Sequence, residues 1–173
     1  MHFYATITRM RVRLYRGDTA GALALLQAHR HDVRRSGALN SGSNRVMWAA
    51  VAGSVIAVAV REGPLPRSAL REATQLAKGV HWPDSWFGAW AHVVFAAVAQ
   101  VNGEPERALA DLDRVEAIAV EQEVHTWVDL ARYRRAQIRR DAEGLDAARA
   151  ALRARGARDP DRWVASWCGE LDG

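Results

Sequence analysis

Histidine pairs are the first feature of this sequence that could carry chemistry, because imidazole nitrogens bind metal ions. His29 and His31 are separated by one residue, and His81, His92 and His125 stand elsewhere. On a helix, positions two apart point about 160–200° apart, so His29 and His31 cannot share a tetrahedral ion. We therefore expect solvated histidines, no metal site and no cofactor.

The polar segment SGSNR, residues 41–45, could be taken for a phosphate-binding loop. It lacks the lysine of such loops, and no strand is expected before it. Ser43 or Asn44 as the N-cap of a following helix explains its polarity instead, because these side chains accept bonds from backbone N–H groups.

No nucleophile–base or metalloprotease motif occurs in the chain. Two acid pairs, Glu104/Glu106 and Asp111/Asp113, fall on helical positions that we expect to be exposed, where general acid–base chemistry has no enclosed site. We therefore expect a protein that is not an enzyme.

Composition narrows the class further. The chain has 173 residues, of which 49% are apolar, and it can bury a real core. Cys168 is its single cysteine, which favours a reducing, cytoplasmic compartment. Arg9, Arg11 and Arg13 interrupt the apolar run that a secretion signal needs. The uncharged run from Val46 to Val60 is shorter than the roughly 17–25 residues that cross a membrane, so we interpret it as a buried helix.

The positive charge is not concentrated. The net charge is +4, and all of the 24 basic residues except Lys78 are arginine. GC-rich coding explains this bias better than a nucleic-acid surface, which usually mixes both cations and gathers them. We do not expect nucleic-acid or membrane binding.

Seven tryptophans are unusual for a chain of this size. Three of them sit within amphipathic segments and are expected to fill gaps between helices: Trp48, Trp86 and Trp127. Three others fit less easily into one repeating unit, and the sequence leaves open whether they cap the last unit or meet another chain: Trp82, Trp163 and Trp167.

A helix-ending residue recurs at nearly regular intervals along the chain, and we call each such position a mark. Gly17, Gly63, Gly103 and Ala142 each precede an Ala-rich amphipathic segment, at intervals of 46, 40 and 39 residues. Spacing in this range is typical of helical repeats, in which each helix pair buries its apolar face only by stacking on the next.

The residue types at each mark indicate that one helix ends there and the next begins. Glycine adopts the left-handed conformation that ends a helix, and a neighbouring acid caps the next one. The expected caps are Asp18, Glu104 and Asp141. The alanines five or six residues after each mark are expected where paired helices cross closely, namely Ala22, Ala69, Ala108 and Ala147.

These patterns predict an all-α protein. The expected pairs are 3–16 with 19–35, 45–62 with 67–78, 85–102 with 105–122, and 125–140 with 145–155, followed by a short helix at 160–168. We expect a single domain, residues 1–173, with repeats at about 1–36, 45–79, 84–122 and 124–156 and a C-terminal cap at 157–173.

The repeated turn resembles that of the tetratricopeptide (TPR) family. Gly17-Asp18 with Ala22-Leu23, and Gly103-Glu104 with Ala108-Leu109, carry the resemblance. The units are longer than the usual repeat, as in the elongated variants of large bacterial regulators. LRARGARDPDRWVASW, residues 152–167, is similar to the end of such arrays in multidomain signalling ATPases and kinases. The family implies an α-α superhelix, a TPR-like solenoid, that binds peptides or partner domains without catalysis.

In that family the first helix of each pair lines a concave groove. Counting back from each mark gives sixteen groove positions, four per pair: Tyr4, Ile7, Arg11 and Leu14; Ala50, Gly53, Ala57 and Val60; Trp90, Val93, Ala97 and Gln100; Asp129, Arg132, Ala136 and Arg139. The side chains expected to contact a partner are Tyr4, Arg11, Trp90, Gln100, Arg132 and Arg139. Arg132 and Arg139 share one helical face and could hold a carboxylate. For the second pair, burial of its small residues against each other is an equal alternative.

Three functions follow from these expectations. The first is a protein-interaction scaffold or regulatory segment, free-standing, homo-oligomeric or part of a larger chain, with a protein or peptide partner. The second is a ligand- or peptide-sensing regulatory domain. The third is a non-catalytic subunit of an enzyme complex. A scaffold requires mixed polar groups in the groove, whereas a sensor requires a closed apolar pocket.

Overall fold

The computed structural model describes residues 2–80, 82 and 85–168, and these ranges fold without a strand. The prediction of an all-α protein is confirmed. The helices are α1 (Phe3–Tyr15), α2 (Thr19–Arg35), α3 (Gly42–Arg61), α4 (Leu70–Lys78), α5 (Trp86–Asn102), α6 (Pro105–Glu121), α7 (His125–Arg139), α8 (Ala142–Ala154) and α9 (Pro160–Cys168), with short 3₁₀ turns η1 (Ala38–Asn40) and η2 (Arg67–Ala69).

The turns between helices use the expected chemistry. Gly17, Gly63 and Gly103 all have positive φ, at 73°, 98° and 77°, so each ends its helix in the left-handed region. Asp18 caps α2 by accepting a bond from the Gly21 N–H at 2.9 Å. Asp141 caps α8 in the same way, from the Gly144 N–H at 3.0 Å. Glu104 stands at the cap of α6 but makes no side-chain cap bond.

The start of α3 corrects one expectation. The helix begins at Gly42 with Ser41 at the cap, so Ser43 and Asn44 lie inside its first turn and neither is the N-cap. The Asn44 amide instead donates to the Ala38 carbonyl at 2.9 Å and accepts from the Tyr4 hydroxyl at 2.8 Å. Its polarity therefore serves to fix η1 and α1 against α3.

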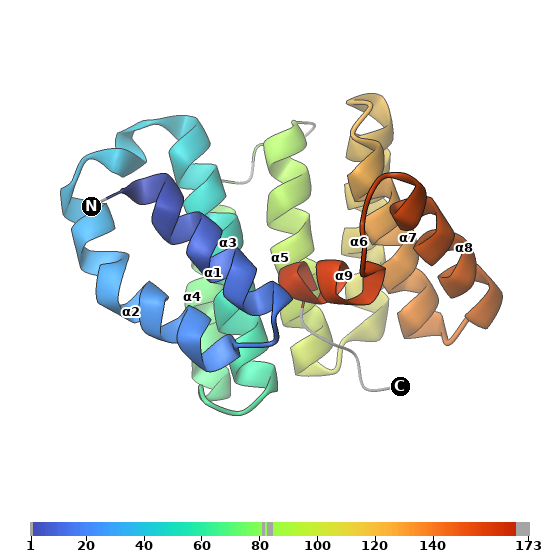
Figure 1. Cartoon of the computed structure of the whole chain (residues 1–173), viewed down its shortest axis with the longest axis horizontal. Coiled ribbons are helices and arrows are strands. Elements are labelled where there is room, and N and C mark those ends of the chain that lie inside the picture. Colours follow the sequence, from blue (N-terminus) through green and yellow to red (C-terminus); the bar gives the residue numbers. More distant parts are fainter. Residues whose placement is uncertain (1, 81, 83–84, 169–173) are drawn as a thin grey trace.

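Consecutive helices pack as pairs, α1 with α2, α3 with α4, α5 with α6 and α7 with α8. Adjacent pairs contact one another through α2 and α3, α4 and α5, and α6 and α7. Figure 1 shows these pairs side by side, with α9 lying across them. The array follows the order of the chain, whereas α9 returns to helices far earlier in the sequence.

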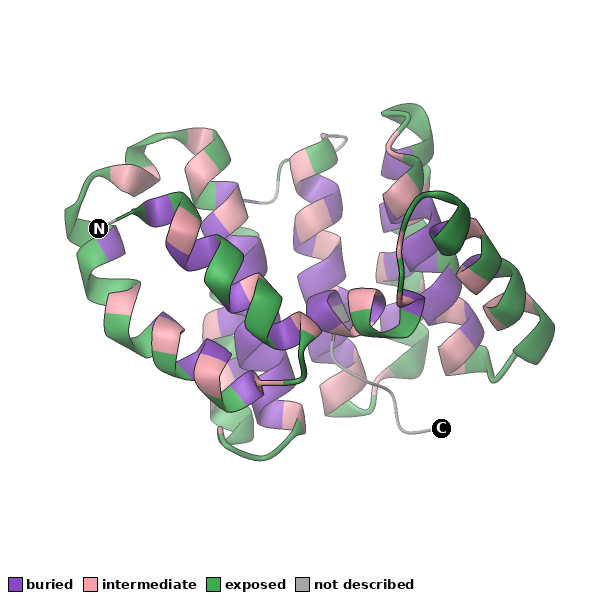
Figure 2. Ribbon diagram, in the orientation of Figure 1, coloured by how far each residue is buried: buried purple, intermediate pink, exposed green. Residues whose placement is uncertain are grey.

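The core lies along α3 and α5, where buried residues dominate the centre of Figure 2. Every residue of α3 from Trp48 to Val60 is buried, so the apolar run is a core helix as expected. Among the described residues, α3 is long and apolar enough to cross a membrane by length and composition alone, but 78% of its apolar window is buried inside the protein.

Two of the four predicted packing alanines are confirmed. Ala22 and Ala108 are each 0% exposed. Ala69 is half-buried because Pro64 and Pro66 precede a 3₁₀ turn there and delay the start of α4 to Leu70. Ala147 is exposed, so that prediction was wrong.

The register of the fourth pair explains the error at Ala147. Asp18, Glu104 and Asp141 are the N-cap residues of their helices. Ala22 and Ala108 each stand four residues after the cap, and the residue four after Asp141 is Leu145. Leu145 packs against the small cluster of Tyr133, Ala148, Leu152 and Val164. Counting from Ala142 placed the contact two residues too late.

Candidate functional site

The C-terminal helix occupies the surface on which the sequence places a binding groove. α9 contacts α1, α3, α5 and α7, the first helices of all four pairs, and also α8. Figure 1 shows it crossing in front of α5 and reaching α1. We call the surface of α1, α3, α5 and α7 that carries α9 the inner face.

Tryptophans from three helices form the centre of this contact. Trp90 of α5 stacks on Trp127 of α7 with ring centroids 5.2 Å apart. Trp167 of α9 packs against both, 5.2 Å from Trp90 and 5.1 Å from Trp127, and is 7% exposed. Trp163 extends the cluster along α9. The open question about Trp163 and Trp167 is thereby answered, because both pack within the chain.

Arg11 fastens the N-terminal helix to α9. Its guanidinium carbon lies 3.0 Å from the ring centroid of Trp167, and Nη2 donates to the Ser166 hydroxyl at 3.4 Å. Ser166 is 1% exposed. Tryptophan is the best aromatic partner in a cation–π contact, and the contact is stronger where water is excluded. The contact therefore joins the two ends of the described chain.

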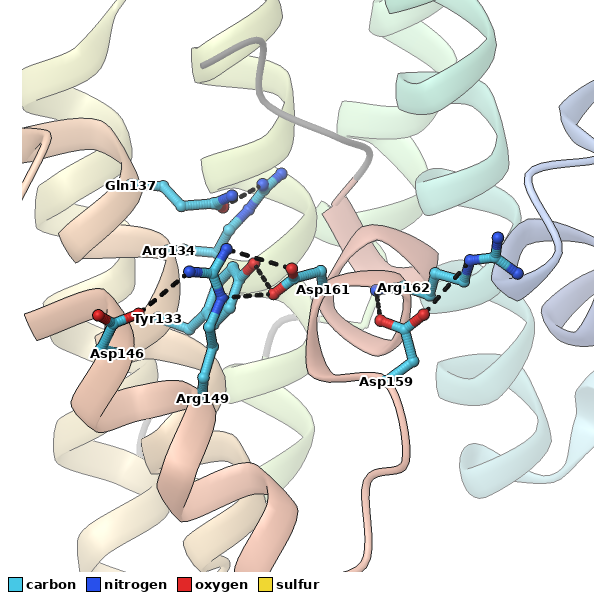
Figure 3. Close-up of polar contacts among 8 residues, drawn as sticks. All are labelled: Tyr133, Arg134, Gln137, Asp146, Arg149, Asp159, Asp161 and Arg162. Carbon is cyan, nitrogen blue, oxygen red and sulfur yellow. Dashed lines mark hydrogen bonds and ion pairs between the residues drawn. The ribbon is translucent and has the colours of Figure 1, made fainter. Parts of the chain in front are cut away.

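A polar cluster holds the other end of α9, and Figure 3 shows its residues converging on Asp161. The Tyr133 hydroxyl donates to Asp161 Oδ1 at 2.6 Å. Arg149 donates from Nε to Oδ1 at 2.8 Å and from Nη2 to Oδ2 at 3.1 Å. This bidentate geometry is the strong form of an arginine–carboxylate pair. We call Tyr133, Arg149 and Asp161 the latch.

The latch alters the protonation of its members. The hydrogen bonds from Arg149 hold the pKa of Asp161 below its ordinary value, and the bond from Tyr133 acts in the same direction. Burial, together with the hydrogen bond to the Asp161 carboxylate, raises the pKa of Tyr133 to about 12. The cluster is therefore a charged carboxylate held by a neutral phenol and a cation through the ordinary pH range.

Two indole N–H groups in the tryptophan cluster are buried without a hydrogen-bond acceptor in the part of the chain that the structure describes. The Nε1 atoms of Trp90 and Trp167 are buried and have no hydrogen-bond partner among the described residues. A buried donor left without an acceptor costs about 1–3 kcal/mol. α9 thus fills the inner face with good ring packing but imperfect polar complementarity.

The predicted contact residues divide between this site and other surfaces. Trp90 and Arg11 lie in the α9 interface. Tyr4 is 60% exposed, bonded to Asn44 near the first turn of α3. Gln100 lies with Val60, Arg61, Arg67 and Val101 at a separate cavity of about 400 Å³, and its Oε1 is buried without a partner in the described part of the chain.

Arg132 and Arg139 lie together, but away from α9. Both line a cavity of about 380 Å³ between α7 and α8. Arg132 donates to Glu116 Oε1 at 2.7 Å, and the neighbouring Arg135 pairs with Asp113 and Glu116. Acidic side chains of α6 already neutralise these two arginines. Among the described residues that line the cavity, Arg139 is the arginine that makes no ion pair.

The middle of the predicted groove is not a surface. Ala50, Gly53, Ala57 and Val60 are all buried in α3, so the alternative for the second pair is the observed one. Small residues let α3 approach its neighbours closely. Of the four, Val60 at the end of the helix also borders the separate cavity beside Gln100.

The outlying tryptophans also divide. Trp48 and Trp127 are 4% and 8% exposed, as core residues should be. Trp86 is 41% exposed, so its assignment to the core was wrong. It stands at the first position of α5, where it packs edge-on against Trp90 at the end of the cluster. Trp82 is 45% exposed and packs against Phe87.

Side chains that could hold a metal are scattered. Within the described ranges, no group of three or more His, Cys, Asp or Glu side chains is placed to bind an ion. His92 instead bonds Asp111 at 2.7 Å and joins α5 to α6. His81, the side chain of Cys168 and residues 169–173 of the predicted cap lie outside the description.

Sequence reasoning missed the latch. Tyr133, Arg149 and Asp161 come from three helices and share no motif, so only folding brings them together. The available signal was an acid in the first turn of a short helix, which usually serves only the helix dipole. Comparison with family models, curated proteins and solved structures finds no match to this chain.

Proposed function

We propose that this protein is a non-catalytic interaction module that receives a helical segment of a protein partner on its inner face. The arrangement that fits this role is a TPR-like solenoid of four helix pairs, acting in the cytoplasm alone or within a larger chain. In the described residues, the cluster of Tyr133, Arg149 and Asp161, in which the Tyr133 pKa is raised and the Asp161 pKa is lowered, holds α9 in place.

One observation carries the proposal: the inner face already holds a helix. Five helices contribute to the contact, and the bound segment packs Trp167 against the stacked pair of Trp90 and Trp127. Buried aromatic anchors in a pocket are the usual centre of a protein–protein interface, with charged groups at the rim. Here Arg11 and the latch take the rim positions.

A cut in the loop before α9 tests this function. A protease site introduced at residues 156–158 is cleaved after the whole chain has folded, so α9 becomes a separate peptide. We expect a labelled peptide of residues 157–168 to exchange with it and bind saturably. A peptide with Trp167→Ala should bind at least tenfold more weakly, because it lacks the central anchor.

The matched control is a peptide with Arg162→Ala, since Arg162 is exposed and pairs only with Asp159 in the described residues. It should bind like the unchanged peptide. A cleaved chain that keeps its helical circular dichroism yet binds none of the three peptides would show that the inner face is not a helix-binding surface.

A further inference from the structure

We propose that α9 is an autoinhibitory segment, and that the partner it excludes is an amphipathic helix with α9's own pattern: a carboxylate followed by aromatic residues two and six positions later. In α9 these are Asp161, Trp163 and Trp167. The inference rests on the proposed function and adds to it the chemistry of the partner and the means of regulation.

The pattern follows from what each residue of α9 contacts. Asp161 meets Tyr133 and Arg149, and Trp167 meets Trp90, Trp127 and Arg11. Trp163 packs beside Trp167 and against the small cluster of Tyr133 and Val164. A foreign helix with the same spacing reaches the same groups. Its two aromatic residues, four positions apart, lie on one helical face, and its carboxylate, two positions before the first of them, points to a different side, as Asp161 does toward Tyr133 and Arg149.

Features of α9 and of the latch favour the release of this helix from the inner face. α9 is a short helix, and such a segment is only marginally helical by itself in water, so its folding depends on the inner face. Gly156, with φ of 95°, ends α8 in the left-handed region, and residues 157–159 then lead directly into α9. The latch is reachable by solvent, since the Asp161 side chain is 53% exposed.

The two unsatisfied indoles supply a reason for exchange. When α9 leaves, the Trp167 N–H gains water as its partner. A partner helix that carries an acceptor side chain beside Trp90 satisfies the other N–H, which α9 leaves buried without a bond. The partner thereby gains an interaction that the resident helix does not make.

Because α9 is joined to the rest of the chain by a short linker, it competes strongly with a free partner helix for the inner face. A short linker gives α9 an effective concentration of the order of millimolar, and a free helix must overcome it. A change that weakens α9 without touching the surface of α5 and α7 therefore raises the apparent affinity for a partner.

The test measures binding of the labelled peptide of residues 157–168 to uncut chains by fluorescence anisotropy. We expect the Asp161→Asn chain to bind the peptide at least tenfold more tightly than the wild-type chain, because its own α9 has lost the latch. The Trp167→Ala chain should behave in the same way, and the Arg162→Ala chain should match the wild type. Circular dichroism checks that each variant is folded.

A second measurement examines the acceptor. Peptides with glutamine at position 162, 164, 165 or 166 are compared on the wild-type and Trp90→Phe chains. At least one should bind the wild type fivefold more tightly than the parent peptide and lose that gain on Trp90→Phe. If none of the glutamine peptides shows this gain, the acceptor requirement is overturned.

The outcomes separate this inference from the function beneath it. Equal affinities for wild-type, Asp161→Asn and Trp167→Ala chains, with binding retained by the loop-cut chain, would overturn autoinhibition alone. Loss of binding in the loop-cut chain as well would overturn the function. A dimer that exchanges α9 between two copies, seen by size-exclusion chromatography with light scattering, would assign the inner face to a second copy and overturn the inference.

Discussion

Ala108 shows how a single methyl group sets the distance between two helices. It is 0% exposed in α6, which packs against α5, and it stands four residues after the cap of α6. We expect Ala108→Leu to overpack this crossing and to lower the free energy of unfolding by roughly 1–3 kcal/mol.

Asp113→Ala is the control for this change, because the same helix carries Asp113 with its side chain 55% exposed in an ion pair to Arg135. Its loss should cost less than about 1 kcal/mol, as exposed pairs usually do. Urea denaturation measures both variants. The reverse ranking would mean that the position of Ala108 in the pair has been misassigned.

Asp161 gives the latch a pH dependence with a defined sign. Its pKa is lowered in the folded chain, so the latch contributes fully above the ordinary aspartate value of about 3.9 and is lost as pH falls through the lower folded value. We expect Asp161→Asn to flatten the acid side of the curve of unfolding free energy against pH, below about pH 4.

The matched change is Asp146→Asn, which removes the more exposed carboxylate beside the same arginine, with its side chain 78% exposed. Urea unfolding between pH 2.5 and 6 gives both curves. If Asp161→Asn and wild-type curves run parallel through this range, the Asp161 carboxylate is not what the latch depends on.

At the scale of the helix, α3 and α5 meet through a glycine. A Cβ at Gly53 would lie 2.8 Å from Cγ1 of Val94, closer than side chains normally approach. Alanine is the better helix former by about 1 kcal/mol, so propensity favours Gly53→Ala. We expect overpacking at the stiff valine to outweigh that gain and to destabilise the protein by about 1 kcal/mol net.

Ser43→Ala, on the exposed first turn of the same helix, should change the free energy of unfolding by less than about 0.5 kcal/mol. Thermal and urea unfolding compare the two. A Gly53→Ala protein more stable than wild type would show that α3 and α5 have room to separate.

At the scale of the whole molecule, α9 couples the two ends of the array. Each unit of a helical repeat ordinarily contacts only its neighbours. Here α9 contacts α7 and α8 at one end of the array and α1 at the other. Arg11→Ala removes the guanidinium from Trp167, and we expect amide hydrogen exchange in α1 and in α9 to become at least tenfold faster together, because each end then opens independently of the other.

Arg9→Ala is the control, since Arg9 lies exposed on the same helix. Exchange read by mass spectrometry should leave α1 of that variant unchanged. Faster exchange in α1 alone, with α9 as protected as before, would contradict the coupling.

Much of the helical order was readable from the residues themselves. Glycine at positive φ, an acid at the cap and an apolar face at helical spacing are local properties, so the pairs and the caps at Asp18 and Asp141 follow from sequence. The failures at Ser43 and Ala147 are also local. In each case the expected helix start, residue 45 or residue 145, is three residues later than the observed one.

No local sequence pattern indicated which surface α9 packs against. Residues 160–168 read equally as a cap or an interface, because a short amphipathic helix fits any complementary apolar surface. The burial of Trp167 against Trp90 and Trp127, and the meeting of Tyr133, Arg149 and Asp161, depend on helices that are far apart in the chain. The sequence by itself determined the helices and their pairing, through short-range backbone geometry and periodicity. Only the tertiary structure decided that α9 covers the inner face, because that choice depends on which surface buries two large aromatic rings with the least exposed apolar area.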